Sequence, residues 1–153
     1  MKVLAFVLLA VVAATAGLML WIRFSPIDAG KWHVDIARAD YAPPPNAAAF
    51  CRTAEARVSF GAGDLAALDA IAVASPRTER LAGSVAEGHI TWVTRSALMG
   101  YPDFTTAQVK GDRLCVVARQ GMGTEDFGVN AARLGGWLQQ LGGLNEAPDL
   151  RWE

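Results

Sequence analysis

Apolar residues fill the start of the chain without interruption. Residues 3–22 carry no charge and lie between Lys2 and Arg23. These twenty residues, rising about 1.5 Å each in a helix, span about 30 Å, which is the thickness of the hydrocarbon core of a bilayer. Trp21 lies at the end of the run, where an indole ring prefers the membrane interface. The pattern predicts one transmembrane helix over residues 1–23.

A cleaved secretory signal is the competing interpretation of this run. Residues 14–16, Ala-Thr-Ala, form the small-x-small pattern of a cleavage site. Cleavage there would leave the apolar residues 17–22 exposed at the new N-terminus, and the whole run is longer than a typical signal core. Basic residues are nearly balanced on the two sides of the run. We favour an uncleaved signal-anchor with the soluble domain outside the cytoplasm, because a short N-terminal tail precedes the long apolar run.

Proline marks the segment that follows the predicted anchor. Pro26 and the three prolines 43–45 resist helix and sheet and favour extended polyproline geometry. We therefore expect residues 24–46 to be a tether and residues 47–143 to form a compact domain, with 144–153 as a C-terminal tail. About 100 residues are enough for one hydrophobic core and too few for two.

Period-two alternation and β-branched residues predict the strands of this domain. The predicted strands are residues 56–60, 89–98, 104–109 and 113–119, with 81–85 as a further short one. Gly111 and Asp112 separate the last two strands, and glycine accepts the positive φ that a two-residue hairpin turn requires. We therefore expect these strands to pair antiparallel.

Two stretches carry apolar residues at helical spacing. The residues on the apolar faces are Leu65, Leu68 and Ala72 in the first stretch and Leu134, Trp137, Leu138 and Leu141 in the second. Asp64 is the expected N-cap of the first helix, which ends before Pro76. The second helix follows Asn130 and ends at Gly142. The order β-α-β-β-β-α predicts a small two-layer α+β domain, in which both helices pack on one face of an antiparallel sheet.

Charge and cysteine content exclude several functions. The chain has 14 basic and 15 acidic residues in mixed order, so it has no basic stripe for nucleic-acid binding. Cys51 and Cys115 are the only cysteines, and with two isolated histidines they form no recognisable metal site. We expect no metal and no cofactor. The two cysteines are either small buried apolar side chains or, outside the cytoplasm, a disulfide.

Residues 126–128 spell Asp-Phe-Gly, the triplet whose aspartate binds magnesium in protein kinases. The other kinase motifs are missing from the sequence, including the glycine-rich loop and the His-Arg-Asp loop. A magnesium or calcium site needs several oxygen ligands, whereas only Glu125 and Asp126 lie together here. Metal binding by Asp126 is therefore not expected.

Helix capping is the expected role of this stretch. Gly123 and Gly128 allow the chain to turn sharply between a strand and a helix. Asp126 or Asn130 then lies where the helix begins and accepts a hydrogen bond from one of its free N–H groups.

Three segments of the C-terminal half share the pattern of one known family. They are residues 75–84 (SPRTERLAGS), 93–106 (VTRSALMGYPDFTT) and 116–138 (VVARQGMGTEDFGVNAARLGGWL). They resemble the bacterial family called domain of unknown function 1499, which tends to have Arg, then Gly, then Ser-Asp-Leu-Gly-x-Asn before its last helix. The matching residues here are Arg119, Gly123, Asp126, Gly128 and Asn130, whereas Gln120 and Glu125 replace the more usual serines.

The resemblance covers roughly residues 47–142 and implies a membrane-attached protein of the bacterial envelope. It brings no established activity. With the predicted anchor, it leads us to expect a single pass through the inner (cytoplasmic) membrane and a periplasmic domain.

Four charged residues fall inside or beside these motifs, namely Arg95, Asp103, Arg119 and Asp126. Two arginines on neighbouring strands can hold a carboxylate or phosphate through bidentate hydrogen bonds, and two aspartates beside them would tune that site. The alternative is structural, with Arg–Asp pairs that pin the loops at one end of the sheet.

Catalysis has little support in the sequence, because a nucleophile or acid–base group needs an oriented partner. His33 lies in the predicted tether, His89 lies at a strand edge, and Ser96 has no obvious base. We predict no catalytic residue and expect a non-catalytic binding or interaction domain that docks an envelope protein. The alternative is a binding module for a small anionic or lipid-derived ligand, held by Arg95 and Arg119.

Overall fold

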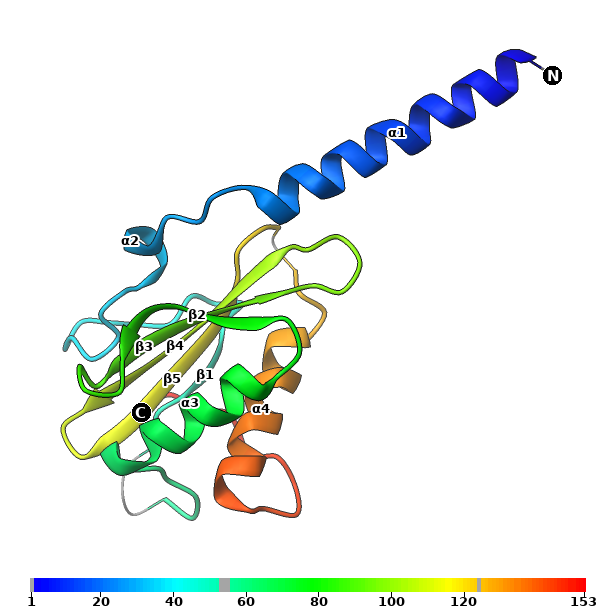
Figure 1. Ribbon diagram of the computed structural model, residues 1–153. Coiled ribbons are helices and arrows are strands. Elements are labelled where there is room, and N and C mark those ends of the chain that lie inside the picture. The colour runs from blue at the N-terminus through cyan, green and yellow to red at the C-terminus, as the bar shows by residue number, and fades with distance from the viewer. Residues whose placement is uncertain (1, 53–55, 124) are drawn as a thin grey trace.

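Among the described residues, five strands form one antiparallel sheet, with two helices on one face (Figure 1). The computed structural model describes residues 2–52, 56–123 and 125–153. The elements are α1 (Lys2–Phe24), α2 (Ala29–Trp32), β1 (Ala48–Phe50), the 3-10 helix η1 (Ala62–Asp64), α3 (Leu65–Ala74), β2 (Thr78–Ser84), β3 (His89–Arg95), β4 (Pro102–Lys110), β5 (Arg113–Gln120) and α4 (Val129–Gly142). The strand order is β1-β5-β4-β3-β2. The predicted α+β class and the N-terminal apolar helix are confirmed.

The helix α1 projects away from the sheet (Figure 1). It has 23 residues and a mean hydropathy of 2.7 in its most apolar window, and no part of that window is buried. Ile22, in its last turn, is the one residue of α1 that is buried by the rest of the described chain. The length and composition of α1 suit a membrane anchor or a signal sequence.

The larger of two hydrophobic cores lies between the sheet and the helices α3 and α4. Its buried residues are Phe50, Phe60, Leu65, Leu68, Ala72, Ile90, Trp92, Ala107, Leu114, Val116, Ala118, Leu134, Trp137 and Leu138. The indole N–H of Trp92 donates to Asp69 Oδ1 over 2.9 Å, and Arg80 pairs with the same carboxylate. Because both oxygens of Asp69 have partners, this carboxylate is tolerated at the edge of the core.

The first predicted strand, residues 56–60, is wrong. Residues 56–58 form bends, and the first strand of the sheet is β1, which pairs with β5. Phe60 is buried, as its alternation with Val58 requires, but only a single bridge joins Gly61 to Arg113 at the start of β5. The strand β1 gives little sequence signal because two of its three residues are alanine, which is depleted in strands.

Other boundaries also differ from the sequence prediction. The strand β2 has seven residues where only 81–85 was expected, and β3 ends at Arg95 because residues 97–99 form a turn. Asp64 is the N-cap residue of α3, as predicted, but its side chain makes no hydrogen bond to that helix. Its Oδ2 instead accepts from the backbone N–H of Gly61 over 2.8 Å. The reason is that η1 precedes α3, and Asp64 satisfies the start of this 3-10 turn.

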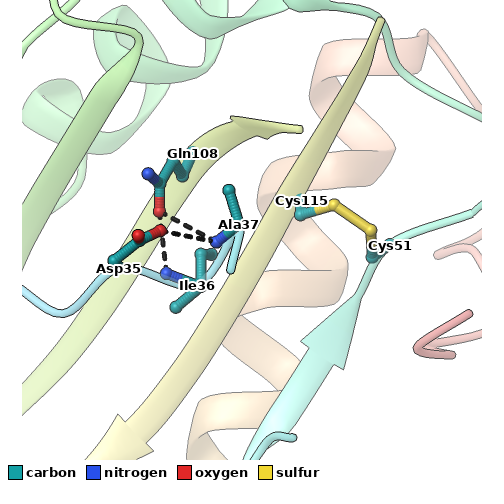
Figure 2. Close-up of a disulfide and its surroundings, with 6 residues drawn as sticks. All are labelled: Asp35, Ile36, Ala37, Cys51, Gln108 and Cys115. Carbon is teal, nitrogen blue, oxygen red and sulfur yellow. Dashed lines mark hydrogen bonds between the residues drawn. A yellow bond between two sulfur atoms is a disulfide. The ribbon is translucent and has the colours of Figure 1, made fainter. Parts of the chain in front are cut away.

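Residues 29–47, here named the strap, cover the face of the sheet opposite α3 and α4. The ring of Trp32 stacks on Phe104 of β4 with 3.9 Å between centroids, and Ile36 has no exposed surface. The side-chain oxygen of Gln108 accepts from the N–H groups of Ile36 and of the next residue, over 2.7 and 3.1 Å (Figure 2). The segment expected to be a free tether is therefore packed on the sheet over most of its length.

A smaller core lies under the strap, and its buried residues are Ile36, Cys51, Cys115 and Val117. Cys51 and Cys115 form a disulfide with their Cα atoms 4.3 Å apart (Figure 2), which decides between the two alternatives that the sequence left open. The C-terminal residues expected to be a tail close the edge of this core. Cys51 N–H donates to Arg151 O over 2.8 Å, and Trp152 packs edge-on against Tyr41.

Removal of the strap and the C-terminal residues is expected to destabilise the domain. A fragment of residues 47–143 keeps α3, α4 and every strand, but it exposes Phe104 and Val117. Full burial of a side chain such as Ile36 contributes about 1.5–3 kcal/mol, so we expect this fragment to melt at least about 10 °C below residues 27–153. Circular dichroism melts of the two fragments measure this difference. A third fragment, residues 47–153, separates the contribution of the C-terminal residues from that of the strap. Equal melting temperatures would contradict a stabilising role for the strap.

Reduction of the Cys51–Cys115 bond is expected to lower the free energy of unfolding by about 4 kcal/mol, because the bond closes a loop across 64 residues. Denaturant titrations of the oxidised protein, the reduced protein and the double variant Cys51→Ala/Cys115→Ala measure this loss. Rapid alkylation of both cysteines in the unfolded, non-reduced protein would show that no disulfide exists.

Candidate functional site

Three parts of the fold enclose a pocket of about 520 Å³ at the end of the sheet nearest α1. Residues 75–78, which follow α3, form one wall, and residues 94–97 at the end of β3 form the next. The third wall comes from Asp103 of β4 and from α4, whose Arg133 and Trp137 face the pocket.

Two arginines of this pocket, Arg77 and Arg95, are held side by side because each donates a hydrogen bond to the backbone carbonyl of the other. Arg95 N–H donates to Arg77 O over 2.9 Å, and Arg77 Nε donates back to Arg95 O over 3.0 Å. Arg77 has a φ of +58°, a backbone conformation that residues other than glycine rarely adopt. The guanidinium of Arg95 donates to Gly100 O over 3.2 Å and to Ile22 O over 3.4 Å. Within the described residues, neither guanidinium forms an ion pair.

Arg133 contributes a third guanidinium, which is paired. Its Nη1 lies 3.5 Å from Asp103 Oδ2, and its Nη2 donates to Asn130 Oδ1. Burial raises the pKa of Asp103, although the charge of Arg133 opposes this. Burial likewise lowers the pKa of Arg133, although Asp103 opposes that change. Three arginines and one aspartate thus belong to the described lining of the pocket, which leaves an excess of positive charge there.

Arg119 lies elsewhere, in a pocket of about 380 Å³ between the strap and β5. It donates to Trp32 O over 2.9 Å, and its guanidinium carbon lies 5.0 Å from the centroid of the Trp32 ring. Burial lowers the pKa of Arg119 from its ordinary value. Trp32 also borders the separate pocket, of about 280 Å³, that Arg95 lines. The structure therefore does not bring the predicted pair of arginines into one pocket.

Asp126 holds the turn that leads into α4. Its Oδ1 accepts from Gly128 N–H over 3.0 Å, and its Oδ2 accepts from Asn130 N–H over 2.9 Å. Burial raises the pKa of Asp126, but these N–H groups outweigh that effect and hold the pKa below its ordinary value. Gly123 and Gly128 have φ angles of +87° and +79°, in the left-handed region that favours glycine. Asp126 and Asp103 line the same hollow, of about 560 Å³.

Sequence reasoning misses Arg77 and Arg133. Arg77 lies in segment 75–84, one of the three that carry the family resemblance, but a charged residue after Ser-Pro looks like an ordinary turn. Arg133 lies one helical turn after Asn130, on the side of α4 that faces Asp103. That position is recognisable only when the pairing of α4 with β4 is known.

Ser75 in the pocket wall and the two histidines are engaged in structural contacts. Ser75 Oγ donates to Ile71 O over 2.9 Å and accepts from the indole N–H of Trp137 over 2.8 Å. His33 and His89 stack on each other under the strap, with 3.7 Å between ring centroids, and do not line the arginine pocket. In the part of the chain that the structure describes, no group of three or more His, Cys, Asp or Glu residues could hold a metal ion.

Comparison with known proteins gives no assignment, because no family model, no curated protein and no solved structure matches this chain. The resemblance to the family of domain of unknown function 1499 stays a prediction from its motifs. Function is therefore argued from the geometry of the site.

Replacement of Asp126 by alanine is expected to destabilise the fold more than replacement by asparagine. Alanine leaves both N–H groups without their acceptor, at a cost of about 0.5–2 kcal/mol, whereas asparagine keeps one acceptor oxygen. Since the folded pKa of Asp126 is lowered, its contribution is present above the unfolded pKa of about 3.9 and is lost as the pH falls through the folded value. Thermal melts of the three proteins from pH 3 to 7 test both expectations.

The same melts with added Mg²⁺ or Ca²⁺ separate capping from metal binding. Stabilisation of the wild type by either ion that vanishes in Asp126→Asn would contradict the capping role.

Proposed function

We propose that this protein is a membrane-anchored bacterial envelope protein whose domain binds a small anionic ligand in the pocket between α3, β3 and α4. The observation that carries the proposal is the pair Arg77 and Arg95, whose guanidinium groups form no ion pair within the described residues. Unpaired arginines in a concave site are suited to a carboxylate or a phosphate, because the planar guanidinium offers two parallel N–H donors.

The remaining chemistry of the pocket suits the same class of ligand. Arg77 uses only its Nε in a hydrogen bond within the described chain, which leaves the donors of its two terminal nitrogens for a ligand. The hydroxyl of Ser96 accepts from Tyr101 N–H over 3.0 Å, and its own hydrogen is able to donate. The apolar lining includes Trp137, Pro76 and Ala132. A volume of about 520 Å³ is in the range of small-molecule sites.

The membrane and compartment are supported by two independent features. The length and composition of α1 suit an anchor, and its last turn contacts the domain through Arg23 and Ile22. The buried disulfide favours an oxidising compartment, such as the periplasm, over the cytoplasm. An inner-membrane protein with a periplasmic domain satisfies both features and agrees with the family resemblance.

Docking of an envelope protein by strand addition has weaker support. The strand β2 is an open edge of the sheet, which is where a partner strand would pair. However, its register shifts between Arg80 and Ala82, and Glu79 and Arg80 are exposed charged residues. Bulges and charges are features that protect an edge from pairing, so the pocket is the better candidate site.

Isothermal titration of the full-length protein in neutral detergent tests the anion site, with inorganic phosphate and pyrophosphate as probes. We expect Arg95→Gln and Arg77→Gln each to weaken binding by about tenfold or more, because each removes a charge-assisted hydrogen bond of about 1.5–3 kcal/mol. Arg95→Lys keeps the positive charge but loses the two parallel N–H donors of the guanidinium. Its affinity should therefore lie between those of the wild type and Arg95→Gln.

Arg113→Gln is the matched control. Arg113 lies at the opposite end of the sheet, so this variant should bind phosphate and pyrophosphate as tightly as the wild type does. Arg119→Gln distinguishes the pocket from the arginine pair predicted by sequence. Equal losses in Arg113→Gln and Arg95→Gln, or no measurable binding by the wild type, would contradict the proposed site.

A further inference from the structure

Large apolar side chains are exposed in two loops at the end of the sheet nearest α1. Outside α1, seven large apolar residues of the described chain are strongly exposed, and five of them belong to these loops or to the first residue of α4. They are Leu98 and Tyr101 in the β3–β4 loop, and Met122, Phe127 and Val129 after β5. Phe127 is 95% exposed and Leu98 is 73% exposed. A cluster of this kind marks an interaction surface.

The β3–β4 loop is attached to the last turn of α1. The guanidinium of Arg23 donates to Ala97 O and Leu98 O, both over 3.3 Å. Gly100 of the same loop approaches so closely that a Cβ atom there would lie 3.2 Å from Arg23 Nε. Leu98 is therefore held beside the last turn of α1, where the apolar run of the helix ends.

The loop after β5 also lies beside the last turn of α1. Met122 lines a pocket together with Trp21 and Ile22 of α1. It also lines a second hollow with Tyr101 and Phe127, which joins the two loops into one surface. In Figure 1 this loop, between β5 and α4, and the β3–β4 loop both lie at the end of the domain from which α1 projects.

Phe127 is held outward by its backbone. Its φ is +52°, in the left-handed region that is costly for a residue with a side chain. Its neighbours fix this conformation, because Asp126, the residue before it, accepts hydrogen bonds from the N–H groups of Gly128 and Asn130, which follow it. A strained backbone that exposes a phenyl ring to water does not stabilise the fold. We therefore expect the ring to contact something outside this domain.

We propose that Leu98, Tyr101, Met122, Phe127 and Val129 form a membrane-docking face that inserts into the interfacial layer of the bilayer spanned by α1. The bilayer is the favoured occupant because this face continues the exposed apolar surface of α1, through Trp21 and Phe24. Aromatic and long apolar side chains are suited to that layer. The inference rests on α1 spanning the membrane, and it does not depend on the anion site.

The charges around this face indicate that apolar contact, and not attraction to anionic lipids, binds it to the membrane. Glu125 and Asp126 lie on the loop after β5, whereas Arg23 and Arg95 lie near the β3–β4 loop. Acidic and basic groups are thus mixed around it. Insertion is therefore expected to depend little on salt or on the proportion of anionic lipid, unlike binding through a polybasic patch.

Site-directed spin labelling of the full chain in proteoliposomes of phosphatidylcholine and phosphatidylglycerol tests the proposal. The native cysteines form a disulfide, so a single introduced cysteine is the one free thiol. Labels are placed by Leu98→Cys and by Phe127→Cys, each with the other apolar residue intact. Ala14→Cys in the middle of α1 and Glu87→Cys in the exposed β2–β3 turn are the membrane and water references.

We expect the ratio of oxygen to nickel-complex accessibility at positions 98 and 127 to be several-fold above that at 87 and to approach that at 14. High salt should leave this ratio unchanged. A ratio at 98 and 127 equal to that at 87 would overturn the proposal, as would labels inaccessible to both reagents, which would show a protein partner or a second copy on this face. A water-like ratio at 14 would show instead that α1 does not span the bilayer.

Discussion

The central constraint on this fold is that the inner strands of the sheet are apolar on both faces and need a cover on each side. Val116 and Ala118 of β5 pack under α3 and α4, whereas Cys115 and Val117, which alternate with them, point to the other face. A strand that is apolar on successive residues cannot face water. The strap supplies the second cover, and its attachment through Gln108 satisfies two backbone N–H groups at the depth where water is excluded.

The strap also determines which charged groups remain free for a ligand. Its Trp32 stacks on Phe104 and accepts a hydrogen bond from Arg119, so that guanidinium is committed to holding the strap. Burial and the nearby charge of His33 lower the pKa of His89, which therefore favours its neutral form where the strap crosses β3. Arg95 lies beyond this cover, where its guanidinium bonds Gly100 O and Ile22 O, and it is among the residues that line the pocket on the helix side.

Sequence periodicity predicts the elements that repeat a pattern and misses the segments that do not. The apolar stripes of α3 and α4, the uncharged run of α1 and the β4–β5 hairpin at Gly111 each leave several regularly spaced residues to detect. The strap has isolated apolar residues, such as Ile36, among prolines and charges, so its burial depends on contacts with β4 and β5 that local sequence does not encode. Arg95 and Asp103 lie in one motif segment and are identifiable from it. Arg77 becomes a neighbour of Arg95 only through the pairing of β2 with β3, and Arg133 reaches Asp103 only through the packing of α4 on the sheet.

The last turn of α1, the anion pocket and the apolar loops are joined by a few contacts at one end of the sheet. Arg23 bonds the β3–β4 loop, and Arg95 bonds both that loop and Ile22 of α1. On the other side of the pocket, the pair of Asp103 and Arg133 ties α4 to β4. Because Asp103 is largely buried, removal of either partner would leave an uncompensated charge in the pocket wall. The pair therefore stabilises α4 in the position that forms the pocket, so the last turn of α1, the proposed anion site and the proposed membrane-docking face are coupled at this end of the sheet.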